Sequence, residues 1–127
     1  MTLKKKTDSS RKNNIRIGFF QYSATGGQSD FARGAALSKG GKSFLCLPST
    51  VETKEGKRKS TITSVLPPGA VVTTQRSDVM YIVTEYGIAD LYLKSIPDRV
   101  KALIAVAHPD FRDELKKQAI EAGLIRG

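Results

Sequence analysis

Two short apolar runs constrain the fold of this chain more than any other feature of its sequence. Residues 43–47 read Ser-Phe-Leu-Cys-Leu and residues 80–84 read Met-Tyr-Ile-Val-Thr, so neither run alternates between apolar and polar side chains. This pattern is typical of a strand that is buried on both faces, as in a parallel or mixed sheet covered by helices. The sequence therefore predicts an α/β fold: a three-layer-like sandwich with a mostly parallel or mixed sheet flanked by helices.

Three further stretches favour strands because they are rich in β-branched or aromatic residues, and these are residues 15–22, 61–66 and 70–74. The charged stretch at residues 54–59 has the composition of a solvated loop. Residues 1–14 are polar and basic, so we expect a disordered leader there, followed by one folded domain at residues 15–127.

Apolar side chains recur at helical spacing in four places. Residues 31–37 predict a short helix that follows a glycine-rich turn. Residues 97–107 and 111–122 predict two helices near the end of the chain, the second of them capped by Asp110. One or two helical turns are expected at residues 88–92, directly after a strand. In this interpretation two strand ends open onto helices.

The net charge of +9 raises the question of nucleic-acid binding, so the distribution of the charge matters. Residues 1–16 hold six Lys or Arg side chains and one Asp, and residues 54–59 form a second basic cluster. Such clusters in tails and loops usually interact with solvent, and we expect no specific nucleic-acid partner. The alternative is a non-catalytic basic module that binds a phosphorylated ligand, a partner subunit or nucleic acid.

The cysteine count and the length of the apolar runs indicate where in the cell this protein is expected. Cys46 is the single cysteine, so it cannot form an internal disulfide, which fits a reducing compartment. The longest apolar runs fall far short of the roughly 20 residues that cross a bilayer, and the N-terminus lacks the apolar segment of a secretory signal. We expect a soluble, cytoplasmic protein without a membrane partner. His108 is the single histidine, so we expect no metal site and a structural role for this residue.

Ligands in open α/β sheets bind where strands end and helices begin, because backbone N–H groups and the positive end of the helix dipole face outward there. The first such junction is the turn at residues 22–28, where Gly26 and Gly27 let the backbone approach a ligand closely. The second places Glu85 after the strand at residues 80–84, where a carboxylate could act as an acid, a base or a fixed acceptor. From spacing alone the glycines could also form a plain turn, and Glu85 could be a charge favoured by the helix dipole.

Three runs of sequence resemble one known family. They are Tyr22-Ser23-Ala24-Thr25-Gly26-Gly27-Gln28-Ser29-Asp30-Phe31 with Arg33-Gly34-Ala35, then Val83-Thr84-Glu85-Tyr86-Gly87-Ile88-Ala89-Asp90-Leu91, and then Ala107-His108-Pro109-Asp110-Phe111-Arg112. In this order and separation they strongly resemble the C-terminal domain of the acetyl-CoA hydrolase/transferase family, which includes enzymes of the 4-hydroxybutyrate CoA-transferase kind. The resemblance covers residues 17–127.

The resemblance implies a fold and an activity. Members of the family are two-domain α/β enzymes that transfer coenzyme A (CoA) from an acyl-CoA to a small carboxylate, or in some cases release it to water. A glutamate attacks the thioester and forms first an acyl-glutamyl anhydride and then a glutamyl-CoA thioester. In the family that glutamate lies upstream of the matching region, so no residue here corresponds to it. We therefore expect this chain to be inactive alone and to need a missing N-terminal half or a partner subunit, with homo-oligomerisation left open.

The resemblance also implies roles for individual residues. The glycine-rich turn resembles the part that donates a backbone N–H to the oxyanion of the intermediates, which matches Gly26 or Gly27. CoA binding is expected along the same turn, at Ser23, Thr25, Gly26, Gly27 and Gln28. Glu85 resembles a supporting residue of the acyl or carboxylate pocket. Ala24 stands where the family commonly has glycine, a change that leaves both later amides in place. We expect the turn and Glu85 to face a shared cleft.

Overall fold

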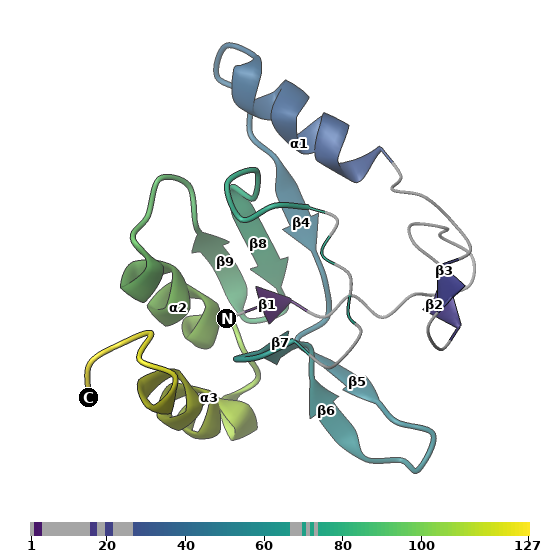
Figure 1. Cartoon of the computed structure of the whole chain (residues 1–127), viewed down its shortest axis with the longest axis vertical. Coiled ribbons are helices and arrows are strands. Elements are labelled where there is room, and N and C mark those ends of the chain that lie inside the picture. Colours follow the sequence, from purple (N-terminus) through teal and green to yellow (C-terminus); the bar gives the residue numbers. More distant parts are fainter. Residues whose placement is uncertain are drawn as a thin grey trace.

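The computed structural model describes residues 2–3, 16–17, 20–21, 27–66, 70, 72 and 74–127. These residues form nine strands and three helices (Figure 1). The strands are β1 (Thr2–Leu3), β2 (Arg16–Ile17), β3 (Phe20–Gln21), β4 (Phe44–Cys46), β5 (Thr50–Glu52), β6 (Arg58–Ser60), β7 (Ile62–Thr63), β8 (Tyr81–Thr84) and β9 (Gly87–Asp90). The helices are α1 (Gln28–Leu37), α2 (Ile96–Ala105) and α3 (Pro109–Glu121).

A three-stranded sheet with the order β4-β8-β9 organises the molecule. Strand β4 runs parallel to β8, with Leu45 opposite Ile82, whereas β9 runs antiparallel to β8, with Ile88 opposite Val83. The two apolar runs of the sequence are therefore neighbouring parallel strands. The sheet is mixed and accompanied by helices, which confirms the predicted α/β class.

The core lies between the β8–β9 part of the sheet and the two C-terminal helices, which lie on the same side of the molecule in Figure 1. Its buried members are Ile62, Ile82, Ala89, Leu91, Leu103, Val106, Ala107 and Leu115. A smaller cluster joins α2 to α3 and to the end of the chain through Val100, Ala119 and Ile125. Helix α1 lies beyond β4 in Figure 1 and buries only Ala32.

Strand β4 is less covered than its sequence pattern predicted. A uniformly apolar strand is expected to be buried on both faces, but Phe44 is 49% exposed and Cys46 is also exposed. Only Leu45 of this strand packs against the main core. The reason is positional, because β4 is an edge strand of this sheet, so Phe44 and Cys46 on its outer face have strand neighbours on one side only.

Several predicted strands differ from the structure. The single strand predicted at residues 15–22 is wrong, because β2 and β3 pair with each other in antiparallel register. The strand at residues 61–66 shortens to β7, after which the Ser64 hydroxyl donates a hydrogen bond to Gln118 of α3. No strand is present at Ala70, Val72 or Thr74, while residues 71 and 73 lie outside the described residues.

The charged stretch at residues 54–59 is only partly a loop. Its tip is a turn in which Gly56 adopts a φ of 74°, but Arg58 and Lys59 belong to β6, which pairs with β5 as a hairpin. The sequence did not predict this strand because its first two residues, Arg58 and Lys59, are charged and exposed, so no apolar alternation marks it. In the predicted leader, Thr2–Leu3 form β1 and pair with β7, while residues 1 and 4–14 lie outside the described residues. The domain boundary at residue 14 stays a prediction.

The predicted helical turns at residues 88–92 are also wrong, because residues 88–90 belong to β9 and no helix follows them before α2. Ile88, Ala89, Leu91 and Tyr92 fit a helical spacing, yet burial alternates, with Ala89 and Leu91 inside and Ile88 exposed. The two helices at the end of the chain are confirmed. Ser95 caps the first, and His108, rather than Asp110, caps the second. Among the residues that the structure describes, no helix is long and apolar enough to span a membrane.

The core assignment predicts unequal costs for two leucines. Leu103 is 4% exposed and belongs to the main core, so Leu103→Ala should lower the free energy of unfolding by about 2–5 kcal/mol. Leu37 is 88% exposed at the end of α1, and Leu37→Ala should change the free energy of unfolding by less than about 0.5 kcal/mol. Urea unfolding of both variants would measure this difference, and equal costs would contradict the core described above.

Candidate functional site

Glu85 lies in a two-residue turn that joins β8 to β9. Thr84 and Gly87 are the last paired residues of this hairpin, so Glu85 and Tyr86 form its loop. Gly87 adopts a φ of 134°, a conformation that is essentially restricted to glycine. The buried Thr84 hydroxyl accepts a hydrogen bond from the N–H of Tyr86 and donates one to the carbonyl of Val106. The turn is therefore fixed to the core on the strand side.

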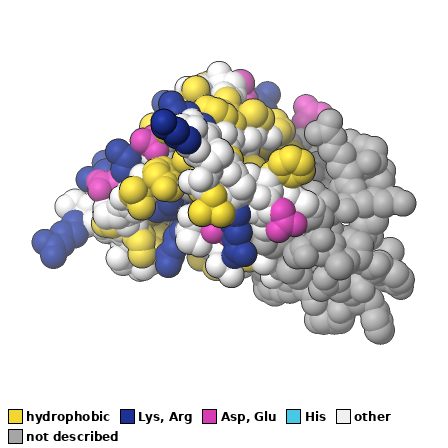
Figure 2. Space-filling view, turned by 90° about the horizontal axis from the view of Figure 1, so that it is seen from above, with side chains coloured by type: hydrophobic (Ala, Val, Ile, Leu, Met, Phe, Trp, Pro, Cys, Tyr) yellow, Lys and Arg dark blue, Asp and Glu magenta, His cyan; other side chains and the backbone are white. Residues whose placement is uncertain are grey.

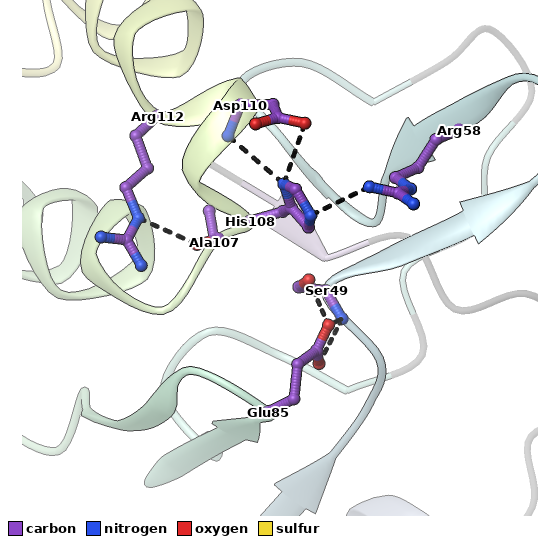
Figure 3. Close-up of polar contacts among 7 residues, drawn as sticks. All are labelled: Ser49, Arg58, Glu85, Ala107, His108, Asp110 and Arg112. Carbon is purple, nitrogen blue, oxygen red and sulfur yellow. Dashed lines mark hydrogen bonds and ion pairs between the residues drawn. The ribbon is translucent and has the colours of Figure 1, made fainter.

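The carboxylate of Glu85 is bound by Ser49, which follows the end of β4 (Figure 3). The backbone nitrogen of Ser49 lies 2.9 Å from Oε2 and 3.2 Å from Oε1 of Glu85, and the Ser49 hydroxyl oxygen lies 2.5 Å from Oε1. Ser49 itself is fully buried. Two donors of one buried residue thus hold a carboxylate whose own residue is exposed.

This arrangement keeps Glu85 ionised. The Ser49 hydroxyl lowers the pKa of Glu85 below its ordinary value of 4.5, because it donates a hydrogen bond to the charged form. Partial burial opposes this effect, while the N–H groups of Glu85 and Ser49 and the nearby His108 lower the pKa further. At neutral pH Glu85 is therefore an acceptor or an anionic group and not a proton donor.

A second group of polar side chains lies around His108 at the start of α3 (Figure 3), and the Tyr86 ring packs against it. The ring contacts Tyr86 edge-on at a centroid distance of 5.4 Å, and Arg58 Nη1 lies 3.2 Å from His108 Nε2. The guanidinium of Arg112 lies 5.6 Å from the centre of the Tyr86 ring and donates from Nε to the carbonyl of Ala107. His108 accepts a hydrogen bond from the N–H of Asp110 as the helix cap, which agrees with its predicted structural role.

The structure describes two separate hollows near the predicted site residues. One is shallow and open, lies where β4 and β8 end, and is lined by Cys46, Leu47, Pro48, Val83, Thr84 and Glu85. The other runs along α1 and is lined by Asp30, Phe31, Gly34, Ala35 and Ser38. They share no lining residue. Seen from above, hydrophobic side chains spread over the α1 end of the molecule (Figure 2), and Phe31 is 82% exposed there.

The predicted glycine turn is described only in part. Ser23, Thr25 and Gly26 lie outside the described residues. Gly27 is the N-cap of α1 and Gln28 is its first residue. The side-chain amide of Gln28 donates to Thr74 Oγ1 at 3.0 Å, and Arg33 pairs with Asp78 at 3.1 Å, so α1 is anchored to the segment that precedes β8. That this turn and Glu85 face a shared cleft stays a prediction.

This chain matches a known protein family over most of its length. The sequence profile described as acetyl-CoA hydrolase/transferase C-terminal domain matches residues 9–119. The chain belongs to this family. The match contains both the glycine turn and Glu85, and it begins inside the segment predicted as a leader.

Family members with assigned activities are close in sequence. Butyryl-CoA:acetate CoA-transferase of Anaerostipes caccae is 50% identical over 86% of this chain and 24% of the relative. The 4-hydroxybutyrate coenzyme A transferase of Clostridium kluyveri is 52% identical over 80% of this chain and 23% of the relative. The crystal structure of RipA from Yersinia pestis superposes with a TM-score of 0.68 at 44% identity, over 78% of this chain and 22% of that one. The chain thus spans about a quarter of the length of these family members.

Sequence reasoning found Glu85 but not the residues around it. Ser49 lies 36 positions away and carries no motif of its own, so only strand pairing reveals it. Arg58 was assigned to a solvated loop, and no role was predicted for Tyr86 or Arg112 within their family runs. The helix-dipole interpretation of Glu85 is wrong, because a strand follows it.

The turn that presents Glu85 should depend on Gly87. A Cβ at this position would meet only Val106 at 3.9 Å, so the cost of Gly87→Ala comes from the φ of 134° and should be about 1–3 kcal/mol. Gly34→Ala in α1 is the control, because nothing lies within 4 Å of its added Cβ and helix propensity should stabilise the chain by up to about 1 kcal/mol. Thermal unfolding would compare them, and a neutral Gly87→Ala would contradict the described turn.

The lowered pKa of Glu85 predicts a pH dependence of stability. Because the folded-state pKa lies below the unfolded one, the contribution of Glu85 is fully present above the unfolded pKa and is lost as pH falls through the folded pKa. Glu85→Gln should therefore be less stable than the wild type near neutral pH, and the difference should shrink in acid. Urea unfolding of both proteins from neutral to acid pH would measure the difference in the free energy of unfolding. A difference that does not change with pH would contradict an ionised Glu85 in the folded state.

Proposed function

We propose that this chain is the C-terminal domain of an enzyme that transfers CoA between an acyl-CoA and a small carboxylate, or releases it by hydrolysis. The observation that carries the proposal is the family match over residues 9–119, which contains the glycine turn and Glu85. Relatives named for CoA transfer between butyryl-CoA and acetate, and for 4-hydroxybutyrate, support this substrate class. The substrates are acyl-CoA and carboxylate, no metal is required, and the expected location is the cytoplasm.

The reaction divides one difficult step into easier ones. A glutamate outside this chain attacks the thioester carbonyl, and the CoA thiolate leaves to give an acyl-glutamyl anhydride. The thiolate then attacks the glutamyl carbonyl, which releases the carboxylate and leaves a glutamyl-CoA thioester. An incoming carboxylate reverses both steps, whereas water would complete hydrolysis. Each attack places negative charge on a carbonyl oxygen, which needs a fixed N–H donor.

The conformation of Gly27 supports a role in binding this oxyanion. Its φ is −70°, which any residue can adopt, and a Cβ would lie 3.7 Å from the Phe31 ring, an ordinary contact. The fold therefore does not itself require glycine at this position. Glycine at this position would instead serve ligand binding, because the absence of a side chain lets a ligand approach the backbone closely. We assign the donor to Gly26 or Gly27, and CoA contacts to the turn that also contains Ser23, Thr25 and Gln28.

The hollow beside Glu85 suits the acyl part of the substrate. Leu47, Pro48 and Val83 supply apolar wall, and Glu85 supplies a fixed negative acceptor at its edge. Glu85 therefore supports the reaction without attacking the thioester.

The exposed outer face of β4 supports a larger assembly. Its apolar pattern predicts a cover on both faces, yet Phe44 and Cys46 are exposed, and the relatives are about four times as long as the part matched here. An upstream half of the same enzyme, or a separate subunit, would supply both this cover and the nucleophilic glutamate.

A hybrid enzyme tests the proposal. This chain replaces the matching quarter of butyryl-CoA:acetate CoA-transferase of Anaerostipes caccae, and CoA exchange between acetyl-CoA and a panel of carboxylates is assayed. We expect turnover, because half of the aligned residues are identical. A folded hybrid that transfers CoA from no acyl-CoA would refute the proposal, and salt-sensitive binding to nucleic acid in its place would favour the basic binding module.

In the same hybrid, Gly27→Val should lower kcat by about 10²–10³-fold, because its side chain would keep the oxyanion away from the backbone N–H and so remove the effect of one donor. The thermal midpoint should change little, because the φ of −70° suits any residue and a Cβ at Gly27 makes only an ordinary contact with Phe31 at 3.7 Å. Gly34→Ala serves as the control and should leave kcat unchanged. Wild-type turnover in Gly27→Val would remove Gly27 from this role.

A further inference from the structure

We propose that Ser49 is the positioning residue of Glu85: its backbone N–H and its hydroxyl hold the Glu85 carboxylate in one orientation at the edge of the hollow between the ends of β4 and β8. The catalytic meaning of this contact rests on the proposed function, but the contact itself can be tested in this chain alone.

Strand pairing brings the two residues together. The N–H of Leu47 donates to the carbonyl of Val83 at 3.0 Å, so β4 and β8 stay side by side just beyond their last assigned pair. Two residues later Ser49 reaches the carboxylate of Glu85 with both of its donors (Figure 3). A carboxylate that accepts two hydrogen bonds from one rigid residue has little freedom to rotate.

Ser49 is itself fixed by the core. It is fully buried, and its carbonyl accepts a hydrogen bond from the N–H of Thr61 at 2.9 Å. The Thr61 hydroxyl donates to the neighbouring carbonyl of Pro48 at 2.7 Å, and Thr61 is 3% exposed. Glu85 is therefore tied through Ser49 to the segment that precedes β7. This is the connection expected of a residue that must hold a reacting group in place.

The charged and titratable groups around Glu85 do not replace Ser49. His108 of the α3 cap lowers the pKa of Glu85 through its charge, Arg58 Nη1 of β6 lies 3.2 Å from His108 Nε2, and Arg112 lies over Tyr86. Cys46 of β4 lines the same hollow, and Asp110 lies beside His108. Within residues 27–66 and 74–127, no Lys, Arg or His forms an ion pair with Glu85. Neutral donors of Ser49 thus hold the anion, and its charge stays available to an N–H or O–H donor on the ligand.

Carbon-13 titration of the Glu85 carboxyl in the 127-residue chain tests the contact, with Glu85→Gln used to assign the signal. In the wild type the pKa should lie below 4.5. Ser49→Ala removes the hydroxyl donor and should raise this pKa, because the charged form loses its shortest hydrogen bond. Ser60→Ala is the matched control: Ser60 is also buried and its hydroxyl donates to Ile62, so the Glu85 pKa should not move. An equal pKa in Ser49→Ala and wild type would overturn the proposal.

Ser49→Cys extends the test if Ser49→Ala fails to fold, because a thiol fills nearly the same space but is a weak donor. The Glu85 pKa should again rise, and a wild-type value would count against Ser49.

Kinetics of the hybrid enzyme test the catalytic consequence. Ser49→Ala should lower kcat more than it changes KM for acyl-CoA, and the acid limb of the kcat profile should move to higher pH. An acid limb at its wild-type position would overturn the positioning role. If the wild-type hybrid is inactive, the proposed function fails, while the titration still decides whether Ser49 holds Glu85.

Discussion

The parallel pairing of β4 with β8 is the interaction on which the rest of this structure depends. It joins the two most apolar runs of the chain in the register that places Leu45 opposite Ile82. Since parallel strands end at the same edge of a sheet, the pairing also carries Ser49 to Glu85, 36 positions away. One backbone ladder therefore builds the sheet and brings Ser49 to the Glu85 carboxylate.

Local sequence predicted the elements whose signals are local. The uniform apolar runs predicted β4 and β8, and Pro97 with the spacing of Val100 and Leu103 predicted α2. Strand β9 was missed because Ile88, Ala89 and Leu91 fit a helix as well as a strand, and only Gly87 at a φ of 134° decides between them. The β5–β6 hairpin was missed because its charged residues face solvent, so no apolar alternation marks it.

Motifs in the sequence identified Glu85 and the glycine turn as candidates, but not their surroundings. The family match includes both, while their roles stay predictions. Ser49 was not predicted, since a contact between the ends of two strands depends on their register. For β4 the sequence predicted more burial than the structure shows, because its pattern indicated burial on both faces while Phe44 is half exposed. The relatives are about four times as long as the part matched here, and under the proposed function the rest of such an enzyme would cover this strand.

We propose that the glycine turn at the start of α1 and the Glu85 turn bind one acyl-CoA. A crystal structure of the active hybrid with acyl-CoA would test this. We expect the thioester carbonyl oxygen to accept a hydrogen bond from the N–H of Gly26 or Gly27, and the acyl group to lie against Glu85. An acyl-CoA bound away from either of these turns would contradict it.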